Sequence, residues 1–487
     1  MSQPKQDAPA GRLAGKKSPT YVRAVNEPEA RASRFTARYM LVSDIAYVLS
    51  AADLGYTPKP TARNLVAALI EMLDGVDSID TTTPPGDIVS QREAWITEKV
   101  GRADGGWLHL GRNRGESLRV FLPRMFFRQT LHEERQALAG LIDALVRRAE
   151  PALEAVAPNY HHLQHSGFAT LGEYLLSWVA TFSKHLERID QADRRLDYGP
   201  PTVSGRPALH KLYDVVTRRL GFSSRALLRR EAIWTQDQFT EPFFVLSLIW
   251  VDLARLAQDL RIWMTPEFGL FEPADEHAGG SSALPHAKVP FGFQAVIGGA
   301  TLAATRLAVE MAAAVNPSEG SEPLYQSATL YTAATDAVAS TRYIADVIAK
   351  GNFKLDELKR KSTTDFAGSS EAHDKLVFEY GVPFRAGHRI LGSLARAHHL
   401  GEPAPDLRAM LKQETGRDID VDQKDIMDIV LGNKLAPETF DLPGLRKIWA
   451  GAAEAARSAQ AAASGPSAVE RASEALIAEA KAWLAKP

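Results

Sequence analysis

The sequence predicts a mainly α-helical protein with three helical domains, the middle one a long bundle of five helices. Five long segments carry apolar residues at intervals of three and four, the spacing that places them on one face of a helix. No stretch alternates apolar and polar residues over the length of a strand, so few strands are expected. With 487 residues, 45% of them hydrophobic, the chain is long enough to bury a large core.

The N-terminal part is expected to contain a tail and a small domain. Residues 1–33 mix both charges and lack the apolar run of a secretory signal, which predicts a disordered tail. Residues 34–124 are expected to form an N-terminal helical domain. Two helices are predicted over 35–55 and 60–75, each closed by a glycine, and a third is predicted to start after TTTPPGD at 81–87.

Residues 125–360 are expected to form the central bundle. Its clearest helix has an apolar stripe made of Leu246, Ile249, Leu253, Leu256, Leu260 and Trp263. The same spacing recurs in four further segments, 125–149, 169–195, 293–315 and 324–350. The remaining residues, 361–487, have shorter helical segments broken by Pro and Gly and end in an Ala-rich stretch, which predicts a C-terminal helical domain.

Composition narrows the class of protein. Lys and Arg total 57 against 59 Asp and Glu, a balance that gives no sign of a nucleic-acid or membrane-surface binder. There is no cysteine, which excludes disulfides, thiolate nucleophiles and Cys-bound metals and fits the reducing cytoplasm. The longest apolar run expected from the sequence, Phe243–Leu256, is too short and too polar to span a bilayer. We therefore expect a cytoplasmic protein without nucleic-acid or membrane partners.

Three weak motif matches do not predict a cofactor. Residues 11–18 resemble a phosphate-binding loop, but their Lys and Ser are separated and no strand precedes them. Residues 418–422 begin like a calcium loop, yet glycine is missing from the sixth position, so the aspartates are interpreted as a solvated helix entry. The histidines of 161–165 could ligate zinc, but no carboxylate or distant histidine is evidently paired with them. No metal or organic cofactor is expected.

Four stretches form a recognisable pattern, in order along the chain. They are WLHLGRNRGESLRVF at 107–121, APNYHHLQHSGFATLGEYLLSWV at 157–179, RLAQDLRIWMTPEFGLFEP at 255–273 with GGSSALPHAKVP at 279–290, and TDF at 364–366 with LVFEYGVPFRAGHRILG at 376–392. Together they resemble the fumarase/aspartase superfamily and, within it, argininosuccinate lyase. The resemblance covers about residues 35–450.

The resemblance implies a fold, an assembly and a reaction. It implies a mostly α-helical subunit whose five-helix middle domains assemble into a homotetramer, with each active site built from three subunits. Family members act on small carboxylate substrates without a cofactor, cleaving a C–N or C–O bond β to a carboxylate and releasing fumarate. This reaction requires a base at a weakly acidic carbon and a means of stabilising the enolate-like carboxylate that forms.

The resemblance also implies roles for individual residues. The first serine of the family's glycine-rich loop is the base, and that position is Ser281 here. A serine can serve only if its alkoxide is stabilised, as backbone N–H groups of a closing loop can do; the alternative is that Ser281 merely caps the next turn. His162 matches the catalytic-region histidine, the alternative being a buried structural histidine. Arg114 matches the substrate-binding arginine, the alternative being a structural ion pair.

Several substrate contacts of the family are altered in this sequence. With the two loop prolines in register, Ala287 stands at the loop lysine and Val289 at the loop asparagine. His286 and Lys288 flank these positions and are candidate replacements. Gln294 stands where the family has the glutamate that partners the histidine. The motifs supply four further candidate substrate contacts, Asn113, His161, Gln164 and Ser282.

Two hypotheses of different classes follow from these matches and departures. The first is a divergent lyase that eliminates the amine from an N-substituted aspartate and releases fumarate, or runs the reverse addition. Its substrate is not argininosuccinate, because the region 315–325 lacks the Gln and Lys that grip the arginine end of that substrate in the family. The second is a catalytically inactive homologue that acts as a binding or scaffold protein. A pocket rebuilt for a different reaction is a third alternative.

Overall fold

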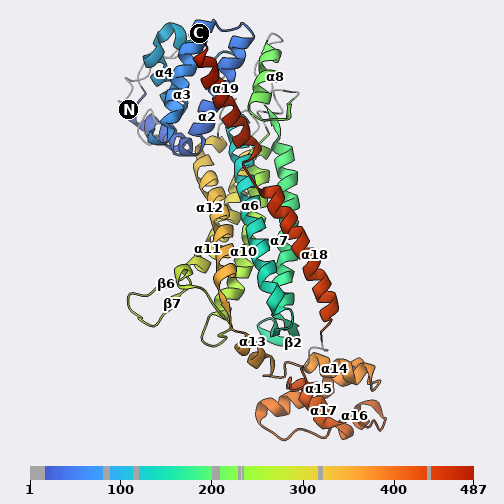
Figure 1. Cartoon of the computed structure of the whole chain (residues 1–487). Helices are drawn as coiled ribbons and strands as arrows, with labels where there is room; N and C mark the ends of the chain where they lie inside the picture. Colours follow the sequence, from blue (N-terminus) through green and yellow to red (C-terminus); the bar gives the residue numbers. More distant parts are fainter. Residues whose placement is uncertain are drawn as a thin grey trace.

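The structure, a computed structural model, describes residues 17–79, 88–112, 120–199, 209–226, 228, 232, 235–315, 322–435 and 440–486, with the side chains of 322–327 excepted. Within this part of the chain the fold is mainly α-helical, which confirms the predicted fold class. Figure 1 shows an elongated molecule with a helical head, a long middle section and a small helical domain at the far end.

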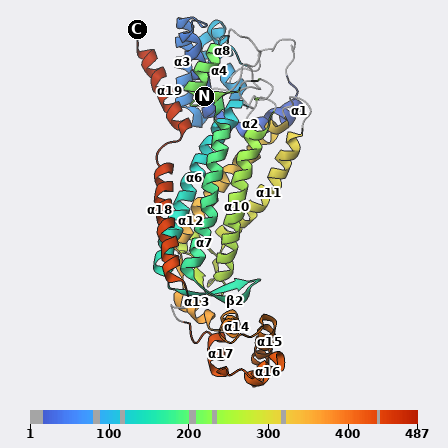
Figure 2. The ribbon, with the colours of Figure 1, turned by 90° about the vertical axis from the view of Figure 1, so that its right-hand side faces the viewer.

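Five long helices form the middle section, as their apolar stripes predict. They are α6 (Leu122–Ala149), α7 (Leu171–Leu196), α10 (Asp237–Trp263), α11 (Phe291–Ala314) and α12 (Glu322–Lys350). The most extensive pairings are α6 with α12, α10 with α11, and α6 with α7. Phe182, Phe243 and Leu253 are fully buried between them. The five helices run side by side along the long axis of the molecule (Figure 2).

The head is assembled from distant parts of the chain. Its helices are α2 (Glu27–Asp53), α3 (Lys59–Asp74), α4 (Ile88–Gly105), α8 (His210–Arg219) and α19 (Ala468–Ala485). Residues 125–360 were expected to belong to the bundle alone, but α8 lies within this range and contributes to the head. The reason is its apolar face, since Leu212 and Val216 are buried in the head's core.

The predicted disordered tail is corrected for its second half. The described chain starts with α1 (Pro19–Tyr21), capped by the Ser18 hydroxyl, and a π-helical turn (Val22–Asn26) leads directly into α2. Ala30 and Ser33, within the expected tail, are buried, and α2 packs against α12. The helix therefore begins earlier than the sequence pattern indicates, because the tertiary contact stabilises its first turns. Residues 1–16 lie outside the described residues.

The small domain contains α14 (Ser369–Phe378), α15 (Phe384–Leu400), α16 (Leu407–Thr415) and α17 (Gln423–Val430). Helix α13 (Leu355–Ser362) precedes it and packs on β1, with Leu358 buried in the core of the bundle. A separate apolar cluster that includes Leu376, Ile390 and Ile426 forms the core of α14 to α17. The Asp422 carboxylate caps α17 by accepting the N–H groups of the next turn, as the interpretation of 418–422 as a helix entry requires.

The predicted C-terminal domain 361–487 is also corrected, because its last two helices leave it. Helix α18 (Leu442–Ala463) runs back along α6 and α7, and α19 continues into the head. Ala453 and Ala456 are buried against the bundle, while Val469 and Leu476 are buried in the head. Alanine gives these helices a narrow face that fits closely against a neighbouring helix. The sequence shows that face but not the surface that receives it.

Strands are few in the described chain, as predicted. The longest pair is the antiparallel hairpin β1 (Val156–His161) and β2 (Gln164–Thr170), which the sequence did not reveal as strands. The others are two-residue pairs: β3 (Tyr198–Gly199) with β4 (Ser224–Arg225), β5 (Phe271–Glu272) with β8 (Asn352–Phe353), and β6 (Gly279–Gly280) with β7 (Lys288–Val289). The hairpin joins α6 to α7 at the bundle end that faces the small domain (Figure 1).

Helix α11 is the most exposed of the bundle helices. Leu302 is 71% exposed and Met311 is 59% exposed, and a groove of about 960 Å³ lies between α11 and α12. By length and composition alone, α11 is apolar enough to cross a membrane, and 22% of its apolar window is buried in the chain. The candidate membrane-spanning segment is thus α11 and not Phe243–Leu256, the run considered from the sequence. That earlier segment lies in α10, which packs in the bundle core.

Candidate active site

The glycine-rich loop 279–290 is a short hairpin between α10 and α11. Strands β6 and β7 pair antiparallel and close its base. A Cβ at Gly279 would lie 2.1 Å from the Phe291 ring, whereas a Cβ at Gly280 would meet nothing within 4 Å. Gly279 is therefore required by its close contact with Phe291, whereas a larger residue would find space at Gly280. The tip of the loop, 281–287, projects from the side of the bundle (Figure 1).

Ser281 stands at the start of the loop tip and is partly exposed. Its Oγ accepts hydrogen bonds from the backbone N–H groups of Leu284, at 3.0 Å, and Ala283, at 3.3 Å. Two N–H donors on one hydroxyl oxygen form the cap of a turn, and the same donors would stabilise negative charge on that oxygen. The same two hydrogen bonds are therefore compatible with Ser281 as a turn cap and with Ser281 as a stabilised alkoxide.

Lys288 is tied to the base of the loop. Its Nζ lies 2.7 Å from the Asp275 carboxylate and 3.3 Å from that of Glu272, which also pairs with Lys354 at 3.1 Å. The hydrogen bond to Asp275 raises the pKa of Lys288. Lys288 in turn lowers the pKa of Asp275, and the hydrogen bonds from Lys354 and Lys288 lower that of Glu272. In this conformation the Lys288 charge is already compensated by two carboxylates, and its role as a replacement for the loop lysine stays a prediction.

The remaining loop candidates face solvent. Ser282 and His286 are exposed on the tip, and Gln294 is exposed in the first turn of α11. The Gln294 backbone N–H donates to the Pro290 carbonyl at 3.1 Å, but within the described contacts its side chain has no hydrogen bond or ion pair. The same holds for the side chains of Ser282 and His286. All three remain available to a ligand or to another subunit.

The turn of the β1–β2 hairpin carries His162. It is a two-residue turn of His162 and Leu163, with φ of 53° and 60°, between the paired residues His161 and Gln164. Such turns usually contain Asn and Gly, because other residues are strained in the left-handed region. All four residues are exposed, and the His161 and His162 rings meet edge to face at 4.3 Å. The alternative of a buried structural histidine therefore does not apply to His162 in this chain.

A second strained pair lies close to the hairpin. Asp365 and Phe366, in the TDF motif, have φ of 56° and 61°, and no other described non-glycine residues except the turn pair have positive φ. His165 Nδ1 is 4.0 Å from the Asp365 carboxylate, and His165 Nε2 is 3.2 Å from the Tyr160 hydroxyl. Burial lowers the pKa of His165, which favours the neutral imidazole. Backbone strain of this kind clusters at functional sites, which makes this corner a candidate.

This corner is only partly predictable from the sequence. His165 was considered as a zinc ligand, but among the described residues no group of three or more His, Cys, Asp or Glu side chains could hold a metal. Asp365 belongs to the TDF motif, and the motif alone does not predict its partner. The contact between them depends on α13 packing under the hairpin, a long-range contact that leaves no local pattern in the sequence.

Asn113 and Arg114 lie outside the described residues, but the residue before them is firmly held. The Arg112 guanidinium is buried, forms an ion pair with Asp44, and lies 4.5 Å from the centre of the Tyr47 ring. Asp44 also forms an ion pair with Arg92, whose Nε lies 2.9 Å from the Asp44 carboxylate. A buried carboxylate with two guanidinium partners is a fixed anchor, since removing one partner would leave an uncompensated charge. The chain entering the segment that carries Arg114 therefore starts from a defined position.

The loop and the hairpin remain separate within one chain. In the described residues, no hydrogen bond or ion pair joins 279–290 to 156–170, and Figure 1 shows the loop on one side of the bundle and the hairpin at its end. Ser281 and His162 thus occur on different elements of one subunit without direct contact.

Comparison with known proteins decides the family. A family model described as lyase matches residues 14–304, more than half of the chain. The chain belongs to this lyase family. The match includes both the hairpin with His162 and the loop with Ser281, and it ends before the small domain.

Similar proteins place this lyase in the fumarase/aspartase superfamily, close to argininosuccinate lyase. It is 28% identical to argininosuccinate lyase from Methanothrix thermoacetophila over 357 residues, 72% of each chain. It is also 28% identical to the enzyme of that name from Archaeoglobus fulgidus over 416 residues, 84% of each chain. A solved EDDS lyase variant with bound fumarate is 21% identical, with a TM-score of 0.71 over 97% of this chain and 98% of that one, and supports the fold.

Proposed function

We propose that this lyase eliminates an amine from an N-substituted aspartate and releases fumarate, or catalyses the reverse addition. In the forward direction the base removes a proton from the CH₂ carbon, the C–N bond breaks, and the electron pair leaves with the nitrogen, which takes up a proton. The products are fumarate and the free amine. We infer that Ser281 is the base, that His162 supports it as an acid or orienting group, and that Arg114 anchors a carboxylate.

One observation carries this proposal. The Ser281 Oγ accepts hydrogen bonds from two backbone N–H groups. An alkoxide needs such donors because a serine hydroxyl is otherwise far too weak an acid to lose its proton near neutral pH. They are backbone groups, so they would remain in place whatever substrate the altered side chains accept.

The altered loop supports a substrate other than argininosuccinate. Ala287 and Val289 offer no charge or amide to a carboxylate, and Lys288 is held by Asp275 and Glu272. The carboxylate adjacent to the acidic carbon must therefore be recognised by other groups. His286, next to Ala287 in the sequence, is an exposed loop residue that could bind this carboxylate.

We also infer that the active unit is a homotetramer in the cytoplasm. Exposed Leu302 and Met311 and the apolar groove beside α12 support the burial of α11 by copies of the same chain rather than by lipid. Such an assembly would also bring loops and hairpins of different subunits together. Leu302→Glu should shift the protein to smaller species in light scattering. An unchanged mass would refute the role of this face.

The lyase proposal is tested with purified protein and a panel of N-substituted aspartates that includes argininosuccinate. Fumarate is followed by its ultraviolet absorbance. Release that persists in Leu284→Ala, an exposed tip position outside the candidate contacts, and disappears in Ser281→Ala supports the assignment of the base, while release that persists in Ser281→Ala refutes it. The Lys288 ion pairs, which leave the loop without a free cation, favour a non-catalytic binding protein as the second candidate. A folded tetramer that is silent across the panel would support that candidate.

A further inference from the structure

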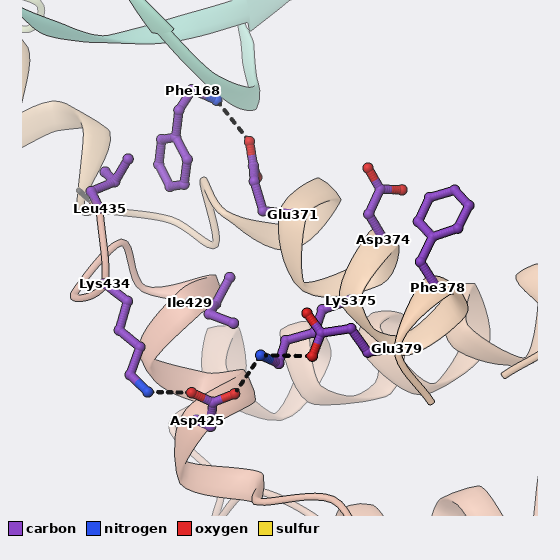
Figure 3. A pocket seen from close by; sticks show the side chains of 10 residues that line it. All are labelled: Phe168, Glu371, Asp374, Lys375, Phe378, Glu379, Asp425, Ile429, Lys434 and Leu435. Carbon is purple, nitrogen blue, oxygen red and sulfur yellow. Dashed lines mark hydrogen bonds and ion pairs between the residues drawn. The ribbon is translucent and has the colours of Figure 1, made fainter. Parts of the chain in front are cut away.

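A second cavity lies away from the loop, between the hairpin and the small domain. Its volume is about 410 Å³, enough for a small organic molecule. Phe168 of β2 forms one wall, and α14, α17 and the turn after α17 form the others (Figure 3). None of the predicted catalytic or substrate-binding residues lines it.

The cavity carries an excess of negative charge. Four carboxylates and two lysines line it, but the lysines are already paired. Lys375 lies 3.1 Å from the Glu379 carboxylate and 3.3 Å from that of Asp425, which also pairs with Lys434. These contacts, drawn in Figure 3, leave no lysine free for an anion.

The other two carboxylates are not neutralised. Glu371 accepts one hydrogen bond from the Phe168 backbone N–H at 3.2 Å, and its Oε2 is shielded from solvent without a hydrogen-bond partner. Burial raises the pKa of Glu371. Asp374, one turn along the same helix, is exposed and has no ion pair among the described residues. In Figure 3 both side chains rise from α14 on the side that faces the hairpin.

Apolar side chains complete the cavity. Phe168 and Phe378 carry aromatic rings on opposite sides, and Phe378 is 81% exposed although it ends a packed helix. Ile429 and Leu435 add aliphatic surface. Aromatic faces attract cations as well as apolar groups, so the rings and the carboxylates favour the same kind of ligand.

We propose that this cavity binds a small organic cation, an ammonium or guanidinium group on an apolar body. The cationic group lies between Glu371 and Asp374, and the apolar body packs against Phe168 and Phe378. Because Glu371 also holds β2, the ligand would tie α14 to the hairpin whose turn carries His162. The proposal does not depend on the lyase reaction.

Three probes of one shape test the proposal on the full-length protein by calorimetry. They are 2-phenylethylammonium, the neutral 2-phenylethanol and the anionic 3-phenylpropanoate. We expect the cation to bind at least about tenfold more tightly than the other two, because charge-assisted hydrogen bonds are the stronger ones. Equal affinity for all three would overturn the proposal, and so would displacement of the cation by excess fumarate.

Variants locate the binding site. Glu371→Gln and Asp374→Asn should each weaken the cation by about tenfold, and Phe378→Ala by a smaller factor. Glu402→Gln removes an exposed carboxylate of the same domain outside the cavity, and it should leave the affinity unchanged. Circular dichroism checks that every variant is folded. Unchanged affinity in both Glu371→Gln and Asp374→Asn would overturn the proposal.

Discussion

The loop 279–290 and the hairpin 156–170 lie toward the same end of the bundle and are built in opposite ways. The loop has glycines at its base and presents an exposed tip. It is held mainly by local contacts, among them the ion pairs of Lys288 with Asp275 and Glu272, here called the lysine clasp. The hairpin places His162 and Leu163 in strained conformations and is held by α13 and α14. One candidate catalytic group therefore stands on a projecting loop held by local contacts, while the other stands on a turn held by neighbouring helices.

The largest effect is expected at the loop tip. Ser281→Ala removes the proposed base, and turnover of the preferred substrate should fall by about 10²- to 10⁴-fold, the usual contribution of a general base. His162→Ala should reduce turnover less, because its role is to support the base. Steady-state kinetics measures both. If His162→Ala is the more damaging of the two, the roles of loop and hairpin are reversed.

A smaller effect distinguishes the two glycines at the base of the loop. Gly279→Ala forces a methyl group against Phe291 and should lower the free energy of unfolding by about 1–3 kcal/mol or disorder the loop. Gly280→Ala enters open space and serves as the matched control, with little change. Thermal unfolding and limited proteolysis report on both variants. Equal behaviour of the two would show that the Phe291 contact does not hold the base.

The strain in the hairpin turn predicts a stabilising substitution. Leu163→Gly replaces an exposed residue at φ 60° by one that adopts this conformation freely, so stability should rise by about 1 kcal/mol. Denaturant unfolding measures the change. A loss of stability would mean that the Leu163 side chain contributes more than its exposure indicates.

These regions also show what the sequence could predict. The five bundle helices follow from apolar stripes, because a buried helical face has to be continuous. The hairpin was missed because its turn contains His162 and Leu163 in place of Asn and Gly. The loop motif predicts Ser281 as a candidate base. It does not predict that Asp275 and Glu272, 13 and 16 residues before Lys288, pair with Lys288, because the fold brings their segment to the loop. The return of α18 along the bundle was missed for the same reason.

The smallest effect concerns the lysine clasp. Lys288→Met should change the free energy of unfolding by less than about 1 kcal/mol, since exposed ion pairs contribute little, but it should raise hydrogen exchange in the loop. The ion pairs lower the pKa values of Asp275 and Glu272 in the folded protein. The clasp is therefore fully present above the pKa values of these groups in the unfolded chain, about 4, and is lost as the pH falls further. The raised pKa of Lys288 preserves the clasp until strongly alkaline pH. Loop exchange that does not respond to acid would show that the clasp does not restrain the loop.

The proposed role of Ser281, moving a proton at a carbon next to a carboxylate, can be tested with the reverse reaction in heavy water. The protein is incubated with fumarate and a panel of amines in D₂O, and the adducts are analysed by mass spectrometry. We expect an N-substituted aspartate with one deuterium on its CH₂ carbon, formed by the wild-type protein and absent with Ser281→Ala. An adduct formed equally well by Ser281→Ala, or no adduct from a folded tetramer with any amine, would contradict it.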